Sequence, residues 1–200
     1  MQGIENKVLK RIYGAGVGSV LSQDDFLDLG SRAAVDKALS RLAAKGTIRR
    51  LARGLYDYPK THPQLGVLAP DPGAVARAIA GKFATRLQPS GAYAANLLGL
   101  STQVPAKIVY LTDGRTKTVR IGKQQIQLKH TTPRNMGTEG RVSGLLIQAF
   151  RHLGKEQIDQ SMIAHLRRGL SSGDKKQLLK DIRYAPAWIT DRIRAIAEDF

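Results

Sequence analysis

Apolar residues recur at helical spacing near the start of the chain. Ile4, Val8 and Ile12 stand four residues apart, which places them on one face of a predicted helix. A glycine-rich break follows, and after it Ser22 and Asp25 have the three-residue spacing of a capping box. The pattern therefore predicts a helix, a short extended segment and then a second, short helix.

A third helix is predicted after Ser31, a residue that suits the N-cap position. Its apolar residues have the i, i+3, i+4, i+7 spacing of one buried face, namely Val35, Ala38, Leu39 and Leu42. Its polar residues fall on the opposite face and are predicted to be exposed, namely Arg32, Lys37, Ser40 and Arg41. Gly46 provides the left-handed conformation that commonly ends a helix.

Two strand-like runs follow, at residues 47–53 and 55–58, and they meet at Gly54. They carry three arginines that are predicted to project outward, namely Arg49, Arg50 and Arg53. This order of elements predicts a winged helix-turn-helix domain over residues 1–59. In such a domain the third helix enters the major groove, and the wing reaches phosphates or the adjacent minor groove. Ser31, the exposed residues of the third helix and the three wing arginines are therefore the predicted DNA-binding residues.

Asp36 lies beside the exposed face of the third helix, where a carboxylate would repel phosphate. The sequence leaves two roles for it, an ion pair with Arg32 four residues earlier or acceptance of a hydrogen bond from a cytosine amino group. Winged helices also serve as protein-binding modules. We prefer DNA binding because the wing arginines and the charge of the whole chain favour it.

Residues 60–200 are predicted to form a second, α+β domain. Residues 60–73 are rich in proline and glycine, which indicates a linker or docking loop. Three strand-like runs predict a small antiparallel β-meander, at residues 107–112, 116–121 and 125–131. Asp113-Gly114 is the hairpin turn expected between the first two. Apolar residues at helical spacing from Val142 onward predict C-terminal helices, so the fold class is α+β.

The charge of the chain narrows the choice of partner. The 200 residues include 32 lysines and arginines against 16 aspartates and glutamates, a formal net charge of +16. Such a surplus favours a polyanionic partner: nucleic acid first, an anionic membrane second and an acidic protein third. Residues 59–138 alone hold 11 basic and 2 acidic residues. An RNA- or protein-binding adaptor with a purely structural winged helix is therefore the alternative.

The chain offers little material for catalysis. It contains no cysteine, which excludes disulfides and thiolate chemistry, and its four histidines have no metal-ligand spacing. No phosphate-binding loop or nucleophile motif is present. We therefore expect no enzyme activity, no metal site and no cofactor. No apolar run reaches the roughly 18–20 residues that a membrane-spanning helix needs, so we expect a cytoplasmic protein without a membrane partner.

Several stretches resemble a known family. The segment "VDKALSRLAAKGTIRRLARGLYDYP" is similar to the winged helix of AbiEi-type antitoxins, which belong to bacterial abortive-infection and toxin–antitoxin systems. The segments "SGAYAANLLGLSTQVPAKIVYLTDG" and "IQLKHT" resemble the domain that follows it in those proteins. The late segment "APAWITDRIR" resembles the end of their shorter relatives, so the resemblance covers most of the chain.

The resemblance implies a DNA-binding antitoxin that also represses its own operon. Such a protein binds inverted repeats in the double-stranded DNA of its own promoter and counters a nucleotidyltransferase-like toxin encoded beside it. The resemblance makes the third helix the recognition helix and the basic hairpin the wing, and it supplies no catalytic residue. The group is described as type IV, which leaves open whether antitoxin and toxin make contact. The oligomeric state is open as well.

Overall fold

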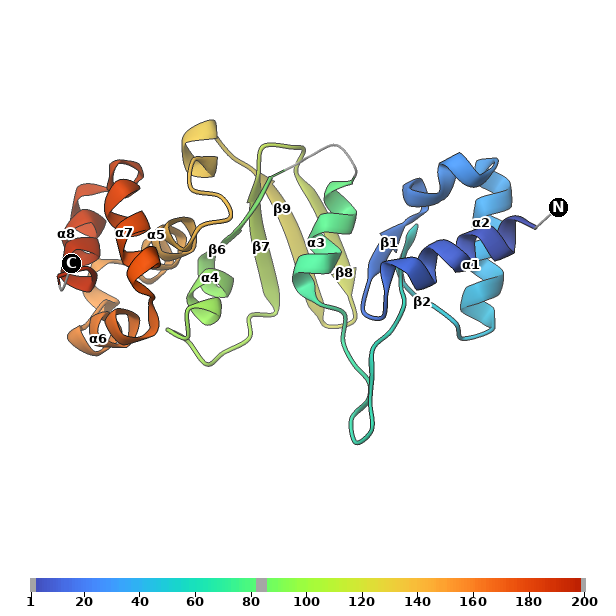
Figure 1. Cartoon of the computed structure of the whole chain (residues 1–200), viewed down its shortest axis with the longest axis horizontal. Helices are drawn as coiled ribbons and strands as arrows, with labels where there is room; N and C mark the ends of the chain where they lie inside the picture. Colours follow the sequence, from blue (N-terminus) through green and yellow to red (C-terminus); the bar gives the residue numbers. More distant parts are fainter. Residues whose placement is uncertain (1–2, 82–85, 199–200) are drawn as a thin grey trace. The chain divides into compact units, whose positions relative to one another are not determined.

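The computed structural model describes residues 3–81 and 86–198 and has the α+β fold that the sequence predicts (Figure 1). The chain forms two compact units, which comprise Met1–Thr85 with Val119–Gly122 and Arg86–Thr118 with Lys123–Phe200. Each unit has its own buried apolar core, so each is described by itself.

The first unit has the element order of a winged helix-turn-helix. Its elements are α1 (Ile4–Ala15), β1 (Val20–Ser22), η1 (Gln23–Leu29), α2 (Arg32–Ala44), β2 (Arg49–Ala52), β3 (Leu55–Asp57), β4 (Thr61–His62), β5 (Gly66–Val67) and α3 (Pro72–Ala80). Strands β1, β3 and β2 form an antiparallel sheet in that order. The predicted short helix is the 3-10 helix η1, whose capping box joins the Ser22 backbone N–H to the Asp25 carboxylate at 2.7 Å.

The core of the first unit lies where the three helices meet. Its buried members are Val8, Ile12, Phe26, Val35, Ala38, Leu39, Leu42, Ile48 and Tyr56. The helical faces expected from the apolar spacing are therefore the buried faces. Burial of several large side chains, at about 1.5–3 kcal/mol each, holds α2 against α1 and η1.

The first unit continues beyond residue 59, where the sequence predicted the first domain to end. Part of the predicted linker forms the β4–β5 hairpin, and Asp71 caps α3 by accepting a hydrogen bond from the Ala74 backbone N–H at 2.7 Å. Helix α3 contacts β1 and buries Val75 and Ala76. These contacts with β1 place α3 in the first unit.

The second unit combines a sheet with a helical C-terminal part, and Val119–Ile121 of its strand β8 (Lys117–Ile121) are grouped with the first unit. Its elements are β6 (Leu87–Ser90), α4 (Gly91–Leu97), β7 (Lys107–Thr112), β8 (Lys117–Ile121), β9 (Gln124–His130), η2 (Pro133–Met136), α5 (Val142–Leu153), η3 (Lys155–Gln157), α6 (Gln160–Gly169), α7 (Ser172–Lys180), η4 (Ile182–Tyr184) and α8 (Ala187–Ile196). The four strands follow the order β6-β7-β9-β8. The C-terminal helices predicted from apolar spacing are confirmed.

The strands of the predicted β-meander form, but their pairing differs from a meander. Strand β9 lies between β7 and β8 and runs parallel to β7, with Ile126 beside Ile108. The central position suits β9 because Ile126 and Leu128 are fully buried. Strand β8 is largely polar and exposed, as is common for an edge strand. Asp113-Gly114 therefore does not connect adjacent strands.

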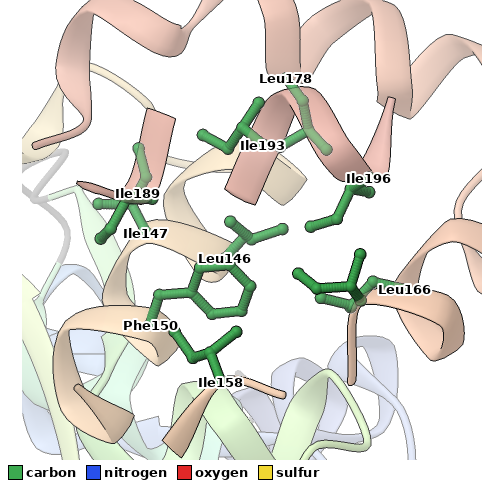
Figure 2. Close-up of a cluster of buried hydrophobic side chains, with 10 residues drawn as sticks. Leu146, Ile147, Phe150, Ile158, Leu166, Leu178, Ile189, Ile193 and Ile196 are labelled. Atoms are coloured by element: carbon green, nitrogen blue, oxygen red, sulfur yellow. The ribbon is translucent and has the colours of Figure 1, made fainter. Parts of the chain in front are cut away.

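The C-terminal helices enclose the core of the second unit. Figure 2 shows side chains from α5, α6, α7 and α8 pointing toward one another. The cluster includes Leu146, Phe150, Ile163, Leu166, Leu178, Ile189, Ile193 and Ile196. A buried carboxylate at its edge, Asp181, accepts hydrogen bonds from Arg141 and Ser143, each at 2.8 Å, and from Gln177 at 2.9 Å. These bonds join the start of α5 to the end of α7.

Candidate nucleic-acid interface

Helix α2 presents a basic face because its apolar face is fully used in the core. Ser31 caps the helix, with its hydroxyl accepting a hydrogen bond from the Ala34 backbone N–H at 3.4 Å. Val35 and Leu39 are 0% exposed. Four polar residues lie on the outer side and are exposed, as predicted: Arg32, Lys37, Ser40 and Arg41. Ser31 is exposed beside them.

The wing is the β2–β3 hairpin, and its turn depends on Gly54. This residue has a φ of 70°, in the left-handed region that favours glycine. Arg50 on β2 and Arg53 beside the turn are both exposed, so their guanidinium groups are available to a partner. The structure thus places two of the three predicted wing arginines on the surface.

Arg49 differs from the prediction that all three wing arginines project outward. Its guanidinium forms a two-pronged ion pair with Asp57, with Nε–Oδ1 at 3.1 Å and Nη2–Oδ2 at 2.5 Å, and also donates to the Leu68 carbonyl at 3.0 Å. Asp57 is 2% exposed and lies directly opposite Arg49 in the β2–β3 pairing. Opposite charges across a strand pair are stabilising, so the correct hairpin register in the sequence would have revealed this pair. Arg49 neutralises a buried carboxylate.

Gln23, which sequence reasoning missed, joins α2 to the wing. Its backbone N–H donates to the Gly54 carbonyl at 3.0 Å. Its side-chain amide donates to Asp36 at 2.6 Å, and its amide oxygen accepts from the Arg32 guanidinium at 3.0 Å. A side chain on Gly54 would collide with this amide, because a Cβ there would lie 2.7 Å from the Gln23 Oε1 atom. Glutamine at the start of a short helix gives no sequence signal for such a role.

The Gln23 amide is also the hydrogen-bond partner of the Asp36 carboxylate. The Asp36 carboxylate neither stands free nor pairs directly with Arg32, because Gln23 bridges the two side chains. Its negative charge is held toward η1 by a short hydrogen bond. The guanidinium of Arg32 keeps further N–H groups beyond the one that Gln23 accepts.

Glu5 on α1 adjusts the charge at the other end of α2. It accepts a hydrogen bond from the Lys45 ammonium at 2.5 Å and lies 3.7 Å from the Arg41 guanidinium. The hydrogen bond from Lys45 lowers the pKa of the Glu5 carboxyl below its usual value, with a smaller effect from Arg41. Arg41 is therefore partly compensated, whereas Lys37 lies in no ion pair that the structure describes.

The resulting surface is chemically suited to a polyanion. Five exposed basic side chains share the α2 face and the wing, namely Arg32, Lys37, Arg41, Arg50 and Arg53. Such side chains bind phosphate oxygens, and arginine also recognises the guanine edge in the major groove. Within residues 3–81 and 86–198, no group of histidine, aspartate or glutamate side chains is arranged to hold a metal ion. No helix in the described part of the chain is long and apolar enough to cross a bilayer.

Fold and surface together define a two-unit α+β protein whose first unit is a winged helix-turn-helix with an exposed basic face. The model of a family of unknown function, DUF6088, matches residues 7–178, and the chain belongs to this family. A search of the curated proteins finds no match.

Proposed function

We propose that this protein binds double-stranded DNA through its winged helix. The observation that carries the proposal is the exposed basic face of α2, which Gln23 holds beside the wing turn. Helix α2 enters the major groove with Arg32 and Lys37 toward base edges or phosphates. Arg50 and Arg53 reach the flanking phosphates or the minor groove.

The biological role that we propose is that of an antitoxin and autorepressor. The support is the resemblance of the winged-helix segment and of "SGAYAANLLGLSTQVP" to AbiEi-type antitoxins. The DNA target is then an inverted repeat in the protein's own promoter. The counterpart is a nucleotidyltransferase-like toxin, whose effect the second unit helps to neutralise.

A gel shift with the full chain tests DNA binding. The probe is the DNA upstream of its own gene, with an unrelated duplex as competitor and KCl as the variable. Retention of the upstream fragment against excess competitor supports a sequence-specific repressor. Equal loss to both duplexes contradicts it.

The residues are tested by the double variant Arg41→Ala/Arg53→Ala, which removes two exposed charges from the proposed interface. We expect the slope of log K against log salt to become shallower by about 1.8, because each lost phosphate contact contributes about 0.9. The matched control is Lys155→Ala/Arg168→Ala, which removes the same charge from exposed positions of the second unit. An unchanged slope in the first variant, or an equal change in the control, rejects the assigned interface.

The second candidate is an RNA- or protein-binding adaptor whose winged helix is structural. The excess of basic residues in residues 59–138, which is larger than that of the winged helix, favours it. An RNA competitor in the same gel shift separates the two proposals. Displacement of the upstream duplex by RNA at equal nucleotide concentration favours the adaptor, and retention favours the repressor.

A further inference from the structure

Two arginines of the second unit, Arg134 and Arg151, lie in no ion pair among the described residues, whereas Arg86 and Arg141 of the same unit do. Residues 86–138 contain eight basic residues and a single acidic one, Asp113. Arg86 occupies that carboxylate, through its backbone N–H at 3.0 Å and its Nε at 2.8 Å. The segment therefore has no further carboxylate to neutralise its other cations.

Arg151, on the last turn of α5, is held in place by neutral groups. Its Nη1 donates to the side-chain oxygen of Asn135 at 2.8 Å, and the Asn135 amide donates to the Thr131 hydroxyl at 2.8 Å. The Thr131 backbone N–H donates in turn to the Thr112 carbonyl at 2.8 Å. This chain of hydrogen bonds fixes the guanidinium at the ends of the parallel strands β7 and β9, but it supplies no negative charge.

Arg134 directly precedes Asn135, the residue that binds Arg151, so its backbone lies close to the Arg151 guanidinium, and its own side chain is exposed. Partial burial lowers the pKa of the Arg151 guanidinium, and the charge of Arg134 lowers it further. Among the described residues neither arginine lies in an ion pair, in contrast to Arg49, Arg86 and Arg141. Two cations that repel each other while one is ordered by hydrogen bonds form a site that an anion stabilises. The planar forks of two arginines match the oxygens of a phosphate.

We propose that Arg134 and Arg151 bind a phosphate group, supplied by the backbone of a nucleic acid or by free phosphate. Asn135 orients Arg151. The site lies in the second unit and does not depend on the proposed DNA binding by α2.

The test compares two double variants of the full chain. Arg134→Gln/Arg151→Gln removes the site, and Lys155→Gln/Arg168→Gln removes the same charge from exposed positions of the same unit. Single-stranded poly(U) is the first probe, because it carries no operator, and its affinity is measured across a series of KCl concentrations. We expect the site variant to lose roughly tenfold at low salt and to lower the salt slope by about 1.4, since each phosphate contact on a single strand contributes about 0.7. The control should lose less than about twofold.

Free phosphate is the second probe. The melting temperature of each protein is compared in phosphate and chloride buffers of equal ionic strength, because a ligand that binds only the native state raises it. A phosphate-dependent rise in melting temperature that disappears only in the site variant supports the site. A loss of poly(U) affinity in the same variant identifies the nucleic-acid backbone as the source of the phosphate group. Equal losses in both double variants, or no loss in either assay, overturn the proposal.

The conservative variant Arg134→Lys/Arg151→Lys keeps the charge, and its affinity for poly(U) should fall between those of the wild type and Arg134→Gln/Arg151→Gln. If the wild-type protein fails to bind its operator but still shows the phosphate-dependent rise in melting temperature, only the winged-helix proposal is rejected.

Discussion

Neighbouring arginines of the wing have opposite environments. Arg49 and Arg50 are adjacent on β2, but only Arg49 is paired with the buried Asp57. The side chain of Arg50 is exposed. Successive side chains along a strand point to opposite faces of the sheet. Two adjacent arginines can therefore have different roles, one structural and one at the surface.

Arg49→Ala and Arg50→Ala should therefore have contrasting effects. Loss of Arg49 leaves Asp57 buried without a partner, and we expect a loss of about 3–5 kcal/mol in the free energy of unfolding of the first unit. Loss of Arg50 should change stability by less than about 0.5 kcal/mol, as is usual for exposed positions, while weakening DNA binding. Urea unfolding and DNA titration of the two variants measure both quantities. Equal stability of the two variants would contradict a structural role for Arg49.

At the scale of elements, the proposed DNA-binding surface depends on contacts between segments. Gln23 from η1 binds Asp36 and Arg32 on α2, and its backbone binds Gly54 in the wing. The orientation of Arg32 relative to the wing therefore depends on an amide that belongs to neither element.

Gln23→Ala should reduce sequence discrimination more than affinity for DNA in general. If Gln23 orients Arg32 toward a base, we expect about a tenfold loss on the operator, equivalent to about 1.4 kcal/mol, and less than about a twofold loss on an unrelated duplex. Gln64→Ala, at an exposed position in the β4–β5 connection, is the matched control. A parallel loss on both duplexes would show that the amide acts only on general affinity.

The Arg86–Asp113 pair joins the start of β6 to the end of β7. Hydrogen bonds from Arg86 lower the pKa of the Asp113 carboxyl below its usual value. Because the pKa of Asp113 is lower in the folded state than in the unfolded state, its ionised carboxylate stabilises the fold fully at pH values above the unfolded-state pKa. This stabilisation is lost as the pH falls to the folded-state pKa. Asp113→Asn should therefore melt below wild type at neutral pH. The difference in melting temperature should shrink as pH falls below the ordinary aspartate pKa and vanish below the lowered pKa of the folded state. A difference that persists there would assign the effect to something other than this ionisation.

Sequence reasoning succeeded for elements whose signal is local. The spacing of Val35, Leu39 and Leu42 specifies the buried face of α2 by itself, and the same holds for the C-terminal helices. It failed where the outcome depends on which segments pair. The position of β9 between β7 and β8, the partner of Arg49 and the role of Gln23 all follow from contacts between separate elements.

For the whole molecule, the dominant physical property is the net charge of +16. Such a charge destabilises the compact state by self-repulsion, and salt screens that repulsion over a Debye length of about 10 Å at 0.1 M. The ion pairs at the surface respond to salt in the opposite direction, but each contributes little.

We therefore expect the melting temperature of the full chain to rise as KCl is increased from low to moderate concentration. Differential scanning calorimetry at fixed pH measures this dependence. A falling melting temperature would mean that attractive pairs such as Lys45–Glu5 outweigh the repulsion among unpaired cations. The same salt series should weaken any nucleic-acid complex, so stability and affinity should change in opposite directions.

The Arg49–Asp57 pair also sets a rule for redesigning the wing. A library intended to change target preference should vary Arg50 and Arg53 freely while keeping Arg49, Asp57 and Gly54 fixed. Randomising all three arginines together would fill the library with members that cannot fold, and selection would then report on folding. Keeping the Arg49–Asp57 pair constant restricts the variation to residues at the surface of the hairpin and leaves the residues that stabilise its fold unchanged.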